Sequence, residues 1–142
     1  MGNWIELATK ETTNSGQPLC REDELNVAYT TRKSTRPKAR IIIGKQLATD
    51  ARWVIGDQVK LLCDPEHHRA LLKRVAENGF VLTGAGKSGG PKLKGKCLRC
   101  YVGIPITSES NKLMLFPNGM EAYTPAFVDV TEEGIEFSTK GN

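Results

Sequence analysis

The cysteines and histidines are the residues of this sequence whose types and spacing could bind a metal. The 142-residue chain contains four cysteines and two histidines. Cys97 and Cys100 have the spacing at which two thiolates bind one zinc ion, and Cys63 with His67, or with His68, could complete a tetrahedral set across a hairpin. Only one such cysteine pair is present, and Cys63 ends the apolar run VKLLC, where a small buried thiol is ordinary. A zinc-stabilised module with these four ligands is therefore an alternative, and neither a metal nor another cofactor is favoured.

The stretch from 81 to 100, VLTGAGKSGGPKLKGKCLRC, contains the end of a phosphate-binding motif. Gly86-Lys87-Ser88 matches the last three positions of G-x-x-x-x-G-K-S, but the opening glycine would stand at position 81, which is Val81. Pro91 also interrupts the helix that must follow such a loop. No nucleophile with an orienting base is evident elsewhere, so the sequence predicts a connector at this place and a protein that is not an enzyme.

Charge is segregated along the chain. The formal net charge is +4, yet residues 25–44 and 78–108 contain no acid, while each stretch carries several lysines and arginines. Most of the acids lie near the beginning and in the last quarter of the sequence, and a few more, such as Asp57 and Asp64, lie between the two basic stretches. Such segregation favours a one-sided electric field, and nucleic acid is the usual partner of a basic face. A merely solvated surface is the other interpretation of the same charges.

Hydrophobic patterning predicts a mainly β protein with short helices. Strands are expected where β-branched and apolar residues cluster or alternate, and helices where apolar residues recur at helical spacing. The expected strands are 4–8, 25–32, 39–44, 57–64, 69–75, 80–84 and 97–106, followed by a hairpin over 126–139; the expected helices are 45–56 and 111–116. Neither a signal peptide nor a membrane-length apolar run is evident, so a cytoplasmic protein without membrane contact is expected.

The segment from 30 to 75 resembles the AbrB-like (SpoVT/AbrB, swapped-hairpin) family. It has a basic strand, an apolar strand passing through Ile43-Gly44-Lys45-Gln46-Leu47 into a short helix, then Gly56-Asp57 and a hairpin. The resemblance implies a swapped-hairpin barrel, formed when two such units interlock. One unit alone leaves sheet edges unpaired. This chain is therefore expected to be either a homodimer or an internally duplicated, pseudo-dimeric monomer.

The C-terminal half is a candidate for a second such unit. LRCYVGIP at 98–105 echoes ARIIIGK, and FVDVTEEGIEFSTK at 127–140 matches the earlier hairpin in type. The expected organisation is an N-terminal strand and loop at 1–29, the AbrB-like unit at 30–80, a Gly/Lys-rich connector at 81–96, and a second β unit at 97–142.

The sequence thus predicts a non-catalytic protein that binds double-stranded DNA and regulates transcription. Basic side chains would neutralise phosphates. The candidate DNA-binding residues are Arg32, Lys33, Arg36, Lys38, Arg40, Lys45, Arg52, Lys87, Lys92 and Lys94. The helix arginine of DNA-binding family members falls near Ala48 and Thr49 here, which favours an alternative: a protein-interaction or antidote protein on the same scaffold.

Overall fold

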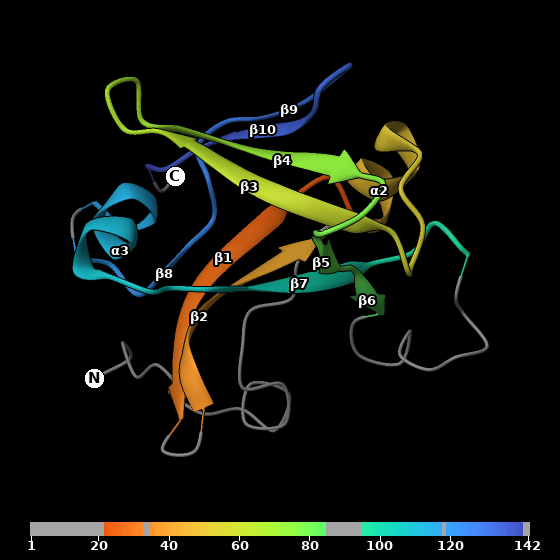
Figure 1. Ribbon diagram of the computed structural model, residues 1–142. Coiled ribbons are helices and arrows are strands. Elements are labelled where there is room, and N and C mark those ends of the chain that lie inside the picture. Colours follow the sequence, from red (N-terminus) through yellow and green to blue (C-terminus); the bar gives the residue numbers. More distant parts are fainter. Residues whose placement is uncertain (1–21, 33–34, 85–94, 118, 141–142) are drawn as a thin grey trace, which may run out of the picture.

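The computed structural model describes residues 22–32, 35–84, 95–117 and 119–140 (Figure 1). The expected mainly β fold with short helices is confirmed. Its elements are β1 (Leu25–Arg32), β2 (Thr35–Ile43), α2 (Lys45–Ala51), β3 (Gln58–Asp64), β4 (Arg69–Val75), β5 (Phe80–Val81), β6 (Thr83–Gly84), β7 (Cys100–Pro105), α3 (Glu109–Leu115), β8 (Ala122–Tyr123), β9 (Val128–Thr131) and β10 (Gly134–Ser138). Within the described ranges, no helix has the length and apolar character needed to cross a membrane.

The strands form two antiparallel sheets that pack against each other. Sheet A has the order β6-β7-β2-β1-β8, and sheet B has the order β5-β3-β4-β10-β9. The chain passes from sheet B to sheet A at Leu82, which is fully buried between β5 and β6. In Figure 1, sheet B lies across the top of sheet A. In the described part of the chain each sheet keeps two edge strands, so the expected barrel is not closed: β5 and β6 pair with different sheets rather than with each other.

The core lies between the two sheets and under α2. Alternate residues of each strand point inward because successive strand side chains face opposite sides of the sheet. The fully buried side chains include Ile41 and Val102 from sheet A and Leu72, Ile135 and Phe137 from sheet B. Their burial fixes which residues of the same strands face outward, and those outward residues form the surfaces described below.

The order β-α-β-β occurs twice in the chain. β2-α2-β3-β4 is followed, after the short strands β5 and β6, by β7-α3-β9-β10, with β8 inserted after α3. Corresponding strands of the two halves are direct antiparallel neighbours, since β2 pairs with β7 and β4 pairs with β10. Antiparallel pairing of like with like is the arrangement that strands adopt across a twofold axis.

Several expected boundaries were wrong. The strand expected at 97–106 spans only Cys100–Pro105, and the strand expected at 80–84 is divided at Leu82 into β5 and β6, which belong to different sheets. The strand expected at 39–44 begins at Thr35 and passes through Pro37, because the β1–β2 register shifts between Thr30 and Arg32 and the ladder there does not need the missing proline N–H. The helix expected to reach residue 56 ends at Ala51, because Arg52 adopts a left-handed conformation with φ 60°. The expected strand 4–8 lies outside the described residues.

Candidate nucleic-acid interface

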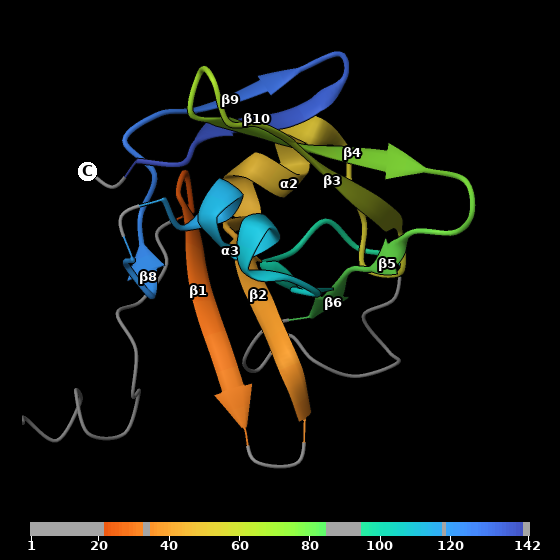
Figure 2. The same cartoon turned by 60° about the vertical axis from the view of Figure 1, so that its left-hand side comes forward.

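The end of the β1–β2 hairpin projects beyond the rest of sheet A (Figure 2). β7 pairs with β2 only from Lys38 onward, apart from a hydrogen bond that the Ile106 N–H donates to the Pro37 carbonyl, and β8 pairs with β1 only at Val27 and Ala28. Beyond these contacts, Thr30 pairs with Lys38 and Arg32 pairs with Thr35, so the end of the hairpin is a two-stranded ribbon. We call residues 30–32 and 35–40 the basic ribbon.

Lys38 and Arg40 lie on the outer face of sheet A, because Ala39 between them is fully buried. Lys38 is opposite Thr30 on β1 and Pro105 on β7. Arg40 is opposite Ala28 and Gly103, which are equally uncharged. Arg36 and Lys38 are exposed, and among the described residues neither takes part in an ion pair. The positive charge of the basic ribbon is therefore not neutralised by its strand neighbours.

Arg40 is only half-exposed, because its side chain packs on an aromatic ring. The guanidinium carbon Cζ lies 4.4 Å from the centre of the Tyr101 ring, a cation–π contact. The Nε atom is buried and has no hydrogen-bond partner in the described part of the protein. Arg40 thus forms the base of the ribbon, while Arg36 and Lys38 carry its freely accessible charge.

The structure does not bring the other basic candidates to this surface. Lys45 and Arg52 are exposed at the two ends of α2, which follows the opposite end of β2 from Arg36. A nine-residue strand is about 30 Å long, so these two residues belong to another region. Arg32 ends β1, but its side chain is outside the described part, and the remaining candidates, Lys33, Lys87, Lys92 and Lys94, lie outside it entirely.

The four candidate zinc ligands of the alternative interpretation do not come together. Cys100 is buried on the inner face of β7, where burial and, to a lesser extent, the nearby Cys97 and Asp57 raise its pKa to about 12. Among the described residues, the group that comes within metal-ligand distance is Asp64, Glu66 and His67, all exposed, and it contains none of the cysteines. The alternation of β3 and β7 directs Cys63 and Cys100 toward the core, away from the exposed turn that holds His67.

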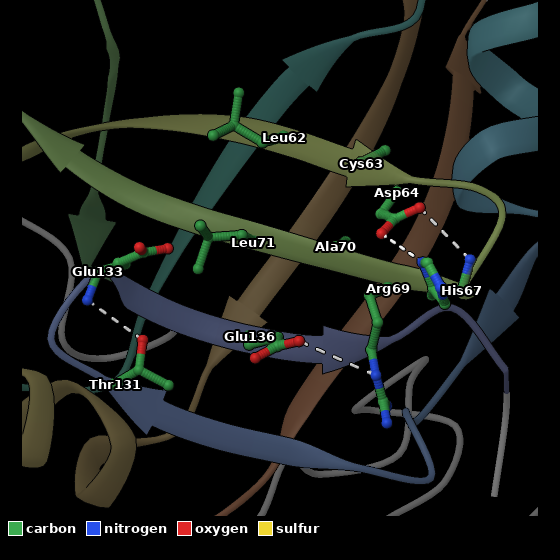
Figure 3. Close-up of a pocket in the computed structure, with 10 residues that line it drawn as sticks. All are labelled: Leu62, Cys63, Asp64, His67, Arg69, Ala70, Leu71, Thr131, Glu133 and Glu136. Atoms are coloured by element: carbon green, nitrogen blue, oxygen red, sulfur yellow. Dashed lines mark hydrogen bonds and ion pairs between the residues drawn. The ribbon is translucent and has the colours of Figure 1, made fainter.

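Sequence reasoning missed a shallow hollow on the outer face of sheet B, with a volume of about 600 Å³ (Figure 3). Leu62 and Leu71 lie opposite each other on β3 and β4 and line it, with Glu136 of β10 beside Leu71. The run LLCDPEHHRALL gave no sign of it, because the sequence alone does not tell which of the adjacent Leu71 and Leu72 faces the core. Strand alternation separates them: Leu72 is fully buried and Leu71 faces outward.

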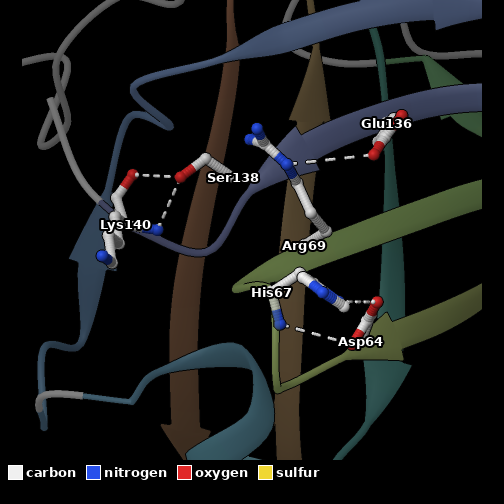
Figure 4. A network of polar contacts seen from close by, with 6 residues as sticks. All are labelled: Asp64, His67, Arg69, Glu136, Ser138 and Lys140. Atoms are coloured by element: carbon white, nitrogen blue, oxygen red, sulfur yellow. Dashed lines mark hydrogen bonds and ion pairs between the residues drawn. The ribbon is translucent and has the colours of Figure 1, made fainter.

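Charged residues at one end of this hollow contact one another (Figure 4). His67 Nδ1 lies 2.8 Å from Asp64 Oδ2, and this hydrogen bond is the main reason that the pKa of Asp64 is lowered. Arg69 Nε lies 3.9 Å from Glu136 Oε1, and the Arg69 guanidinium also stacks 4.3 Å from the centre of the Phe127 ring. These contacts form a polar border on one side of the two leucines.

No family model, curated protein or solved structure matches the chain significantly.

Proposed function

We propose that the protein binds double-stranded DNA through the basic ribbon and acts as a non-catalytic transcription regulator. The carrying observation is a projecting two-stranded ribbon whose exposed Arg36 and Lys38 have no acidic neighbour on β1, β2 or β7. The major groove of B-DNA is wide enough to admit a two-stranded β-ribbon. Lysine and arginine at its surface can then contact the phosphates on either side.

The proposed scaffold is an AbrB-like core that is duplicated within one chain. Two observations support it: the repeated β-α-β-β order, and the pairing of β2 with β7 and of β4 with β10. In these two ladders Ile41 faces Val102 and Leu71 faces Glu136. In this proposal the two halves take the places of the two subunits of a swapped-hairpin dimer.

The test is a salt titration of DNA binding by the double variant Arg36→Ala/Lys38→Ala. Each phosphate contact contributes about 0.9 to the slope of log K against log salt concentration. Loss of two contacts should therefore lower the slope by about 1.8, and should weaken binding roughly 60-fold near 0.1 M salt. Fluorescence anisotropy of a labelled duplex of mixed sequence measures both quantities.

The matched control is Lys96→Ala/Lys140→Ala, which removes the same charge from two exposed lysines outside β1 and β2. Its slope should stay close to that of the unmodified protein. Equal slopes for the ribbon variant and the unmodified protein would contradict the proposal, as would an absence of duplex binding at low salt.

A further inference from the structure

The outer face of sheet B is an ordered grid of side chains with charged residues at its borders, and the Asp64, His67 and Arg69 end is described above. β3 presents Lys60, Leu62 and Asp64 outward, because Val59 is buried and Leu61 and Cys63 pack against the core. β4 presents Arg69, Leu71 and Lys73 on the same face. Because the strands are antiparallel, Lys73 lies opposite Lys60 and Arg69 lies opposite Asp64. β10 and β9 add Glu136 and Asp129.

Two pairs of like charges stand directly opposite each other on this face. Lys60 is paired with Lys73 across β3 and β4, and Glu136 is paired with Asp129 across β10 and β9. Directly opposed like charges destabilise a sheet. In the described part of the chain, Lys60, Lys73 and Asp129 form no ion pair, and Glu136 has only the 3.9 Å contact with Arg69. A partner that supplies opposite charge at both places would remove both repulsions.

Apolar surface lies between these two charged pairs. Leu62 is 48% exposed although it sits near the middle of a strand, and Leu71 beside it lines the same hollow. The direct neighbour of Leu71 on β10 is Glu136. One row of side chains across the four strands therefore consists of Leu62, Leu71, Glu136 and Asp129. The face therefore has an apolar centre with a basic pair on one side and an acidic pair on the other.

We propose that this face binds a second copy of the chain across a twofold axis. From strand spacing, the centres of the lysine pair and the acidic pair lie about 12 Å apart. A twofold axis lying parallel to the face, midway between the two pairs, passes over Leu71. It brings the leucines of the two copies together and sets Lys60 and Lys73 of each copy against Glu136 and Asp129 of the other. Such an interface is self-complementary, as a twofold interface must be.

The charge pattern favours a second copy over an unrelated partner. An unrelated basic segment would neutralise Glu136 and Asp129 but leave Lys60 and Lys73 opposed, and an acidic segment would do the reverse. The same face of a second copy, related by this twofold axis, neutralises both pairs at once and covers Leu62 and Leu71. This interface is independent of the basic ribbon, which belongs to sheet A.

Charge exchange between the two pairs tests the proposal. The unmodified protein should have twice the 15.6 kDa mass of one chain in light scattering or sedimentation equilibrium. Lys60→Glu/Lys73→Glu and Asp129→Lys/Glu136→Lys should each be monomeric, because like charges then meet at both contacts. An equimolar mixture of the two variants should regain the doubled mass, because all contacts between the two different variants are again attractive.

The design controls for folding, since each variant keeps an opposed pair of like charges on its own sheet. Circular dichroism and thermal unfolding verify that both variants are folded. Leu62→Glu, at an exposed position, is an independent variant that should also be monomeric. A monomeric unmodified protein at every concentration overturns the proposal and leaves the face to a different partner. The proposal is also overturned if each charge variant, measured separately, has the doubled mass. Failure of the mixture to associate when both variants are folded overturns it as well.

Discussion

Gly134 is the position where a single methyl group should damage the fold most clearly. It begins β10, has φ 148° and lies against the backbone of β4. A Cβ atom added there would lie 2.0 Å from the carbonyl oxygen of Leu72, far closer than any non-bonded contact allows. Gly134→Ala must therefore shift the β4–β10 pairing or distort the turn from β9.

The expected size of the effect has two parts. A non-glycine residue held at such a φ costs about 1–3 kcal/mol, and forced overpacking against a neighbouring strand typically costs about 1–3 kcal/mol. Together they predict that Gly134→Ala lowers the free energy of unfolding by about 2–6 kcal/mol. For a domain of this size that corresponds to a fall in melting temperature of roughly 4–24 °C. Urea denaturation followed by circular dichroism measures the free energy directly.

Gly103→Ala is the matched control. Gly103 lies in β7, and a Cβ atom there would meet only Lys38 Cδ at an ordinary 3.5 Å. This substitution should change the free energy of unfolding by less than about 1 kcal/mol, and it can stabilise the protein by reducing the freedom of the unfolded chain. Equal stabilities of the two alanine variants would refute the reasoning, because only the position of the added methyl group distinguishes them.

Two further predictions concern buried polar groups. Tyr123 donates a 2.7 Å hydrogen bond from its hydroxyl to the carbonyl of Leu115 in the core, so Tyr123→Phe should lower the free energy of unfolding by about 1–2 kcal/mol in urea titrations; an unchanged value would show that the carbonyl finds another partner. Burial raises the pKa of Cys100 to about 12, so its thiol should resist alkylation at pH 8 until the protein unfolds, whereas the less buried Cys97 should react first in peptide mass mapping. Because the folded pKa is the higher one, this group's contribution to stability is fully present below pH 9 and is lost as pH rises toward 12; rapid alkylation of Cys100 in the folded protein would contradict the burial.

The basic residues of the ribbon were predictable because their clustering is local: residues 25–44 contain five basic residues and no acid. The extension of β2 back to Thr35 was not predictable, because Pro37 argues against a strand until the pairing with β1 is known. The grouping of Lys45 and Arg52 with the ribbon was a consequence of sequence proximity. These residues follow β2 in the chain, but the length of an extended strand carries them to its far end.

The outer face of sheet B could not be predicted because its register depends on distant residues. The segment RALLKRV fits either assignment of its two adjacent leucines until β4 is paired on both sides. Leu71 meets Glu136 only because β10, more than sixty residues later, adds to the edge of β4. No local pattern encodes that meeting, and a slip of one residue would have buried Leu71 and exposed Leu72.

The interleaving of the two halves has a consequence for synthesis. β2 and β4 come from the first half of the chain, and their neighbours β7 and β10 come from the second. A ribosome-bound chain that ends before β7 therefore exposes two strand edges with unpaired backbone groups. The second half of another nascent chain can satisfy those edges with the same strand pairs, so the folding yield should depend on how closely ribosomes are spaced on the message.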